Sequence, residues 1–351
     1  MNSNISQHQN FIDWMKAAGM LIIVYGHVFG SPFNPLNEIS QPIYSKQLGV
    51  AFFIFVMGWS LGNESRTRMR VVFNRLFPIY FYGILSAIIL SCIFIFTKND
   101  INESNYLPFI LGINVFLDYF PANTTTWYIG TYLHLLLFWY FFLQNKSITI
   151  KHLLLALIVE NIFRMTFIAL GQNTTAYMIL PNWLTIFLLG VYLHQQQDKI
   201  ETNLRTVYLL IIGWVILLLI WQQAANAIGF SGGFPFRQFN NSGLFSLPIL
   251  SILISLVYLI NTLLFFEIAR RLPGHWLISF FSRNTLIIFI AHIPVIFELS
   301  GYFYSLFETK WIARIAWIIF LYVGLALISE LIQKFINIKS LRERAWKIIA
   351  R

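Results

Sequence analysis

Long apolar stretches recur along almost the whole chain, and they constrain the fold more than any other feature. A helix needs about 20 mostly apolar residues to cross the roughly 30 Å hydrocarbon core of a bilayer. Backbone polar groups inside lipid must be paired within their own segment. The runs therefore predict an all-α polytopic membrane protein with about ten transmembrane helices, at 11–30, 48–63, 77–97, 127–143, 152–170, 177–194, 207–224, 244–266, 281–299 and 312–336.

The composition agrees with a membrane protein. Hydrophobic residues make up 58% of the chain and charged residues 11%, whereas about a quarter of a soluble domain is charged. No linker, low-complexity tract or clear repeat divides the sequence, so we expect residues 1–351 to form a single membrane domain. Residues 1–10 lack the basic start of a secretory signal peptide, so we expect the first apolar run to be a permanent span.

Basic residues predict the orientation, because cytoplasmic loops carry an excess of Lys and Arg. With the N-terminus inside, 18 of the 24 Lys and Arg residues fall on the cytoplasmic side, 5 fall outside, and Arg164 lies mid-span. Both termini are therefore expected in the cytoplasm. The net charge of +10 is then a topology signal, and nothing resembles a nucleic-acid-binding module. The tail 337–351 alternates basic and apolar residues, as an amphipathic helix at the membrane surface does.

Three ionisable residues stand out in the first span, FIDWMKAAGMLIIVYGHVFG (11–30). Asp13 and Lys16 lie near its cytoplasmic end, and His27 lies roughly 16 Å further along the helix than Lys16, at 1.5 Å per residue. At about 100° per residue, all three share one helix face. Ionisable groups that face lipid are costly, so this face should point to a cavity or another helix. An ion pair between Asp13 and Lys16 with a hydrogen-bonded His27 is the simpler, structural alternative.

Five segments occur in an order that resembles the acyltransferase 3 family, whose members are integral membrane enzymes that O-acylate sugars and glycans. They are the first span, "VAFFIFVMGWSLG" (50–62), "NRLFPIYFYG" (74–83), "TWYIGTYLHLLLFWY" (126–140) and "FSRNTLIIFIAHIPVI" (281–296). The resemblance covers nearly the whole chain. Two departures concern basic positions: Lys16 stands where the family has Arg, and the family's Arg-x-x-Arg pair before the third span is replaced by Arg66, Arg68 and Arg70.

The resemblance implies transfer of an acyl group, with acetyl favoured, from cytoplasmic acetyl-CoA to a hydroxyl of a sugar or cell-surface glycan. It places the protein in the cell inner membrane as a multi-pass enzyme that needs no metal. His27 is the expected general base, since imidazole titrates near neutrality; Asp13 and Lys16 would line or brace the path to it. The partner that orients His27 should come from another span. Four arginines are candidates to hold the CoA phosphates, although each also fits a pure topology role: Arg66, Arg68, Arg70 and Arg75.

Further polar residues inside the spans are candidates for the acceptor site, namely Trp127, Glu160, Arg164 and His292. Glu160 and Arg164 are four residues apart on one span, so mutual neutralisation is the structural alternative. For His292, a packed and hydrogen-bonded histidine is the alternative, and for Trp127 an interfacial aromatic belt. A secondary transporter or flippase for a sugar-linked solute is the competing function, since it would also combine many spans with buried charges. The oligomeric state and the acceptor are left open.

Overall fold

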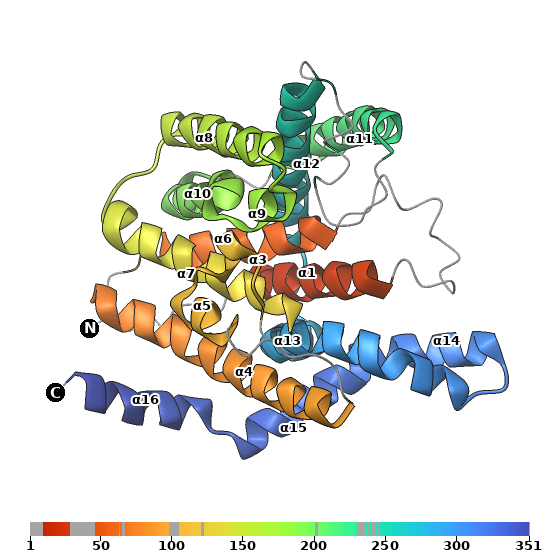
Figure 1. Cartoon of the computed structure of the whole chain (residues 1–351). Helices are drawn as coiled ribbons and strands as arrows, with labels where there is room; N and C mark the ends of the chain where they lie inside the picture. Colours follow the sequence, from red (N-terminus) through yellow and green to blue (C-terminus); the bar gives the residue numbers. More distant parts are fainter. Residues whose placement is uncertain are drawn as a thin grey trace.

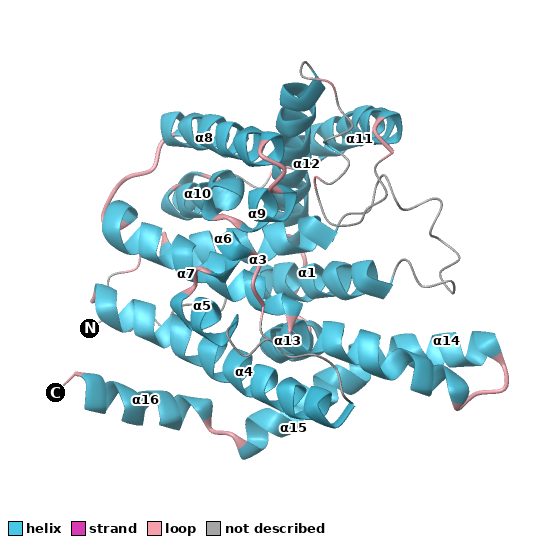
Figure 2. Ribbon diagram, viewed as in Figure 1, coloured by secondary structure: helices cyan, strands magenta, loops and turns pink. Residues whose placement is uncertain are grey.

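The computed structural model describes residues 10–28, 46–62, 64, 67–97, 105–120, 123–200, 203–229, 236, 239, 243 and 246–350. Within this part of the chain every regular element is a helix, as Figures 1 and 2 show. The longer helices are α1 (Asn10–Val28), α3 (Lys46–Leu61), α4 (Arg68–Thr97), α7 (Trp127–Phe138), α8 (Ile150–Ala169), α10 (Leu184–Gln195), α11 (Leu204–Ala227), α12 (Ser246–Ala269), α13 (Trp276–Ser305), α14 (Lys310–Ile319), α15 (Leu325–Phe335) and α16 (Ile338–Ile349).

Six helices are long and apolar enough to cross a membrane: Arg68–Ile95, Ile150–Ala169, Leu204–Ala224, Ser246–Ala269, Trp276–Ser305 and Lys310–Phe335. They agree with six of the ten expected spans and support a multi-pass membrane protein. The other four expected spans fall on α1, which carries three ionisable groups, on the 16-residue α3, and on the 12-residue α7 and α10. Their crossing of the membrane, like the side on which the termini lie, stays a prediction.

Short or irregular pieces flank several of these helices. A π-helical turn, η3 (Trp139–Leu143), extends α7, and another, η7 (Phe320–Gly324), joins α14 to α15. The segment before α7 forms two short helices, α5 (Tyr106–Leu111) and α6 (Asn114–Leu117), and the 3-10 turn η2 (Thr124–Thr126) leads into α7. Between α8 and α10 lie α9 (Asn173–Met178) and η4 (Leu180–Trp183), while η5 (Gln197–Lys199) follows α10.

Glycines allow α3 to pack tightly against two neighbours. A Cβ on Gly58 would overlap the carbonyl of Phe187 in α10, and a Cβ on Gly190 would overlap the carbonyl of Phe55. Gly19 and Gly49 make the same close approach between α1 and α3. Small residues that let backbones meet are the usual basis of helix packing in lipid. Helix α3 thus lies between α1 and α10 in a tightly packed, buried centre.

The C-terminal helix α16 lies beside the beginning of α4 (Figure 1). Arg70 of α4 is the main contact, since it forms an ion pair with Glu343 and its guanidinium lies 4.7 Å from the centre of the Trp346 ring. The Phe73 ring also contacts Trp346, with ring centres 5.1 Å apart and planes tilted by 48°. A helix therefore occupies most of the expected amphipathic tail, and α4 holds it.

Candidate functional site

Helices α1 and α13 run side by side in the same direction and meet through polar side chains at two levels. At the first level, the carboxylate of Asp13 accepts hydrogen bonds from Ser279 (2.7 Å) and Ser282 (2.6 Å) of α13. Asp13 is only 7% exposed, and two hydroxyl donors satisfy a buried carboxylate in the way that burial demands. The face of α1 that carries the ionisable residues therefore turns toward α13.

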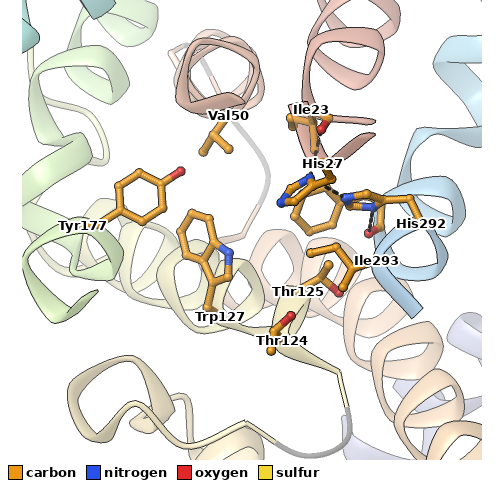
Figure 3. A pocket seen from close by; sticks show the side chains of 10 residues that line it. Ile23, His27, Val50, Thr124, Thr125, Trp127, Tyr177, His292 and Ile293 are labelled. Carbon is orange, nitrogen blue, oxygen red and sulfur yellow. Dashed lines mark hydrogen bonds between the residues drawn. The ribbon is translucent and has the colours of Figure 1, made fainter. Parts of the chain in front are cut away.

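At the second level, His27 meets His292. The two ring centres are 4.8 Å apart, and Nε2 of His292 lies 3.1 Å from Nδ1 of His27. Nδ1 of His27 is also 2.9 Å from the carbonyl of Ile23, while Nδ1 of His292 is 2.7 Å from the carbonyl of Phe289. Figure 3 shows this chain of contacts on one side of a cavity.

These contacts fix the tautomers of the neutral rings. A carbonyl oxygen only accepts, so each Nδ1 carries its hydrogen and each Nε2 carries a lone pair. Nδ1–H of His27 is then shared between the Ile23 carbonyl and Nε2 of His292. In this tautomer the lone pair of His27 is on Nε2. Which nitrogen of a histidine is protonated follows from the bond that the other one makes, and here the neighbouring histidine helps to make that bond.

Both histidines line a small cavity of about 60 Å³, which we call the histidine cavity. Its lining comes from α1, α3, α7, α9, α13 and η2: Ile23, His27, Val50, Thr124, Thr125, Trp127, Tyr177, Phe289, His292 and Ile293. Trp127 and Tyr177 stand opposite the histidines, with their ring centres 4.9 Å apart (Figure 3). Of the expected acceptor-site residues, Trp127 and His292 therefore lie at this cavity.

A proline in α13 frees a backbone carbonyl to which the wall of the histidine cavity is attached. Pro294 has no N–H, so the carbonyl of Ile290, four residues earlier, loses its helical donor. The buried amide of Asn123 donates to that carbonyl instead, at 2.7 Å. The other end of this amide accepts from the backbone N–H of Thr125 at 3.0 Å and from its hydroxyl at 2.7 Å. Asn123 thus ties the segment that leads to Trp127 onto α13, directly beside His292.

A second cavity, of about 260 Å³, lies at the level of Lys16, and we call it the cation cavity. Lys16, Arg75 and Arg283 reach it from α1, α4 and α13, and Tyr128, Tyr132 and Phe289 are among its aromatic lining. Arg75 donates two hydrogen bonds to Ser60, at 3.0 Å to the hydroxyl and 2.9 Å to the carbonyl. Its buried Nε has no hydrogen-bond partner among the described residues. Three positive side chains around one cavity suit an anionic ligand.

Glu160 and Arg164 lie elsewhere, in a fully buried network. The arginine bonds to Glu160 at 2.5 Å, to Asn182 at 2.9 Å and to the hydroxyl of Ser255 at 2.7 Å. Ser255 in turn donates to Glu160 at 2.6 Å. Neither ion contributes to the lining of the histidine cavity. The network joins α8, η4 and α12.

The family comparison decides the class of protein. A family model described as an acyltransferase domain matches residues 9–332, which is nearly the whole chain. The chain belongs to the acyltransferase 3 family. No match was found among curated proteins, and none among solved structures.

In this acyltransferase 3 family member the expected arginines separate into different environments. Arg75 lines the cation cavity, whereas Arg68 is exposed and donates to the carbonyl of Tyr140 at 3.2 Å. Arg70 is occupied by Glu343 and Trp346. Arg66 lies outside the described residues. Within the part of the chain that the structure describes, the interactions therefore single out Arg75.

Two features of this family member were not anticipated from its sequence. His292 was expected as an acceptor-site candidate, not as the neighbour that bonds to His27. Arg283 was counted only as a topology residue, although it lies nine residues before His292 in the family-like segment 281–296. The nine residues from Arg283 to His292 resemble the 11 residues from Lys16 to His27. This similarity was the signal that each of two adjacent helices carries a cation followed by a histidine.

Proposed function

We propose that this acyltransferase moves an acetyl group from acetyl-CoA, bound from the cytoplasmic side, to a hydroxyl of a sugar or glycan. The observation that carries the proposal is the contact between His27 and His292 at a small cavity, with three cations gathered one level below. Lys16 precedes His27 by roughly 16 Å of helix, and Arg283 precedes His292 by roughly 14 Å. Such a separation suits CoA, whose extended arm keeps its phosphates far from its thioester.

In the proposed reaction, Nε2 of His27 takes the proton of the acceptor hydroxyl as the oxygen attacks the thioester carbonyl. The new C–O bond forms, the C–S bond breaks, and the imidazolium returns its proton to the departing thiolate of CoA. His292 orients His27 and accepts from its Nδ1–H while the ring is charged, which is the part that a third group plays in such constellations. Trp127 offers an indole N–H across the cavity to a sugar oxygen or to the developing oxyanion.

Binding of acetyl-CoA to the purified protein in detergent tests the donor half of this proposal. We expect saturable binding that Arg75→Ala weakens about 10- to 100-fold, the worth of a charge-assisted hydrogen bond of about 1.5–3 kcal/mol. His27→Ala should keep the binding, because His27 acts on the proton of the acceptor hydroxyl and does not line the cation cavity. Arg68→Ala is the matched control: it also removes an arginine from the same helix, but one outside the cation cavity.

Absence of acyl-CoA binding to a folded wild-type protein would contradict the proposal and favour a secondary transporter or flippase. Equal weakening by Arg75→Ala and Arg68→Ala would argue for general attraction by positive charge and against a donor site at the cation cavity.

A further inference from the structure

One side chain, Phe289, separates the two cavities. It contributes to the lining of both, and its ring is only 7% exposed. The ring centre lies 5.0 Å from that of Tyr128 in α7 and 6.5 Å from that of Phe53 in α3. Tyr128 and Phe53 line the cation cavity but not the histidine cavity. Three rings from three helices therefore form an aromatic partition across the path between the cations and the histidines.

The space beyond this partition is small. One water-sized group needs about 10–15 Å³ of such volume, so the 60 Å³ of the histidine cavity holds roughly four to six. An acetyl group together with the hydroxyl-bearing carbon of an acceptor fills that space. A longer acyl chain would compete with the acceptor for this space or press on the Phe289 ring.

We propose that Phe289 is the residue that limits the transferred group to acetyl. This inference rests on the proposed function and narrows its donor to short acyl thioesters of CoA. The main chain of Phe289 has a separate role, because its carbonyl accepts from His292. Truncation of the side chain enlarges the space next to the thioester and leaves the contact that orients the histidine pair.

Competition binding tests the proposal without an acceptor. The purified wild type, Phe289→Ala and Phe281→Ala are each loaded with labelled CoA. The affinities of acetyl-CoA, butyryl-CoA and free CoA are then measured from how well each displaces the label. Phe281 is the matched control, since it is a half-buried phenylalanine of the same helix that lines neither cavity. Affinity for free CoA reports whether each variant is folded, and Phe289→Leu provides a milder truncation if the alanine variant does not fold.

The wild type and Phe281→Ala should bind butyryl-CoA more weakly than acetyl-CoA. Phe289→Ala should reverse this order, with butyryl-CoA bound on the order of tenfold more tightly, because each methylene that becomes buried adds about fourfold. An unchanged order in folded Phe289 variants, or the same reversal in Phe281→Ala, would overturn the proposal and leave the acyltransferase function standing. Loss of CoA binding in the wild type as well would overturn both.

Discussion

His292 offers a direct test of how the histidine pair works. Replacement by leucine removes the ring nitrogen that accepts from Nδ1–H of His27, a contact of 3.1 Å. The Ile23 carbonyl remains as an acceptor at 2.9 Å, so the tautomer of His27 should survive. Replacement by glutamine retains an acceptor oxygen at a similar distance from the backbone. The two variants therefore separate loss of the acceptor from loss of the imidazole.

The expected magnitude follows from the charge on His27 during the reaction. A hydrogen bond to a neutral partner contributes about 0.5–1.5 kcal/mol, and one to a charged partner about 1.5–3 kcal/mol. Only the difference between the two, about 1–1.5 kcal/mol, lowers the activation free energy, because the neutral hydrogen bond already exists before the proton moves. This difference corresponds to a roughly tenfold slower rate for His292→Leu, while removal of the base itself in His27→Ala should cost about 10²–10⁴.

The assay is hydrolysis of acetyl-CoA by the purified protein, with water as the acceptor and the released CoA thiol as the signal. We expect His292→Leu to lower kcat about tenfold with little change in KM, and His292→Gln to recover most of the rate. A His292→Leu rate within twofold of the wild type would refute the orienting role. A loss as large as that of His27→Ala would instead make His292 the base.

Three further outcomes follow from buried or paired groups. Asp13→Ala should destabilise the protein by about 2–4 kcal/mol, since it removes a buried carboxylate that accepts two hydrogen bonds, and a thermal-unfolding comparison with Asp13→Asn checks this. Arg164→Met should cost about 3–5 kcal/mol because it leaves Glu160 buried without its partner, whereas the additional change Glu160→Gln should recover much of the loss in the same measurement. The hydrogen bond from Arg70 lowers the pKa of Glu343 below its usual value. The resulting stabilisation of the docked tail is present above the ordinary glutamate pKa and is lost as the pH falls through the lowered one. Protection factors of the amides of residues 338–349, which correct for the intrinsic pH dependence of exchange, should therefore fall on acidification and be lower already at neutral pH in Glu343→Gln.

The helical class could be read from the sequence because hydrophobic length is a local property. Six of the expected spans appear as long apolar helices. The centre of the molecule was harder to anticipate, since α3 and α10 owe their tight contact to glycine pairs such as Gly58 and Gly190. The backbone that each glycine contacts depends on how distant segments pack, so a local sequence pattern does not predict it.

The site was predictable along each helix but not between helices. Helical periodicity placed Asp13, Lys16 and His27 on one face, and the structure turns that face toward α13. The neighbours of that face were not readable, because His292 and Arg283 come from a helix more than 240 residues later in the chain. The role of Asn123 was hidden for a different reason: its contact with α13 depends on the carbonyl that Pro294 leaves without a helical donor.

Asp13 and His27 lie roughly 21 Å apart along α1, and both side chains contact α13. A slip of α1 by one residue would move each side chain by about 1.5 Å along the axis and turn it by about 100°. The close approach of Gly19 to Gly49 resists such a slip, because Ala18 or Met20 would take the place of the glycine. Asp13 resists it strongly, since its carboxylate would leave Ser279 and Ser282 while still buried. Asp13 and the glycine contact therefore both hold α1 in the register in which His27 meets His292.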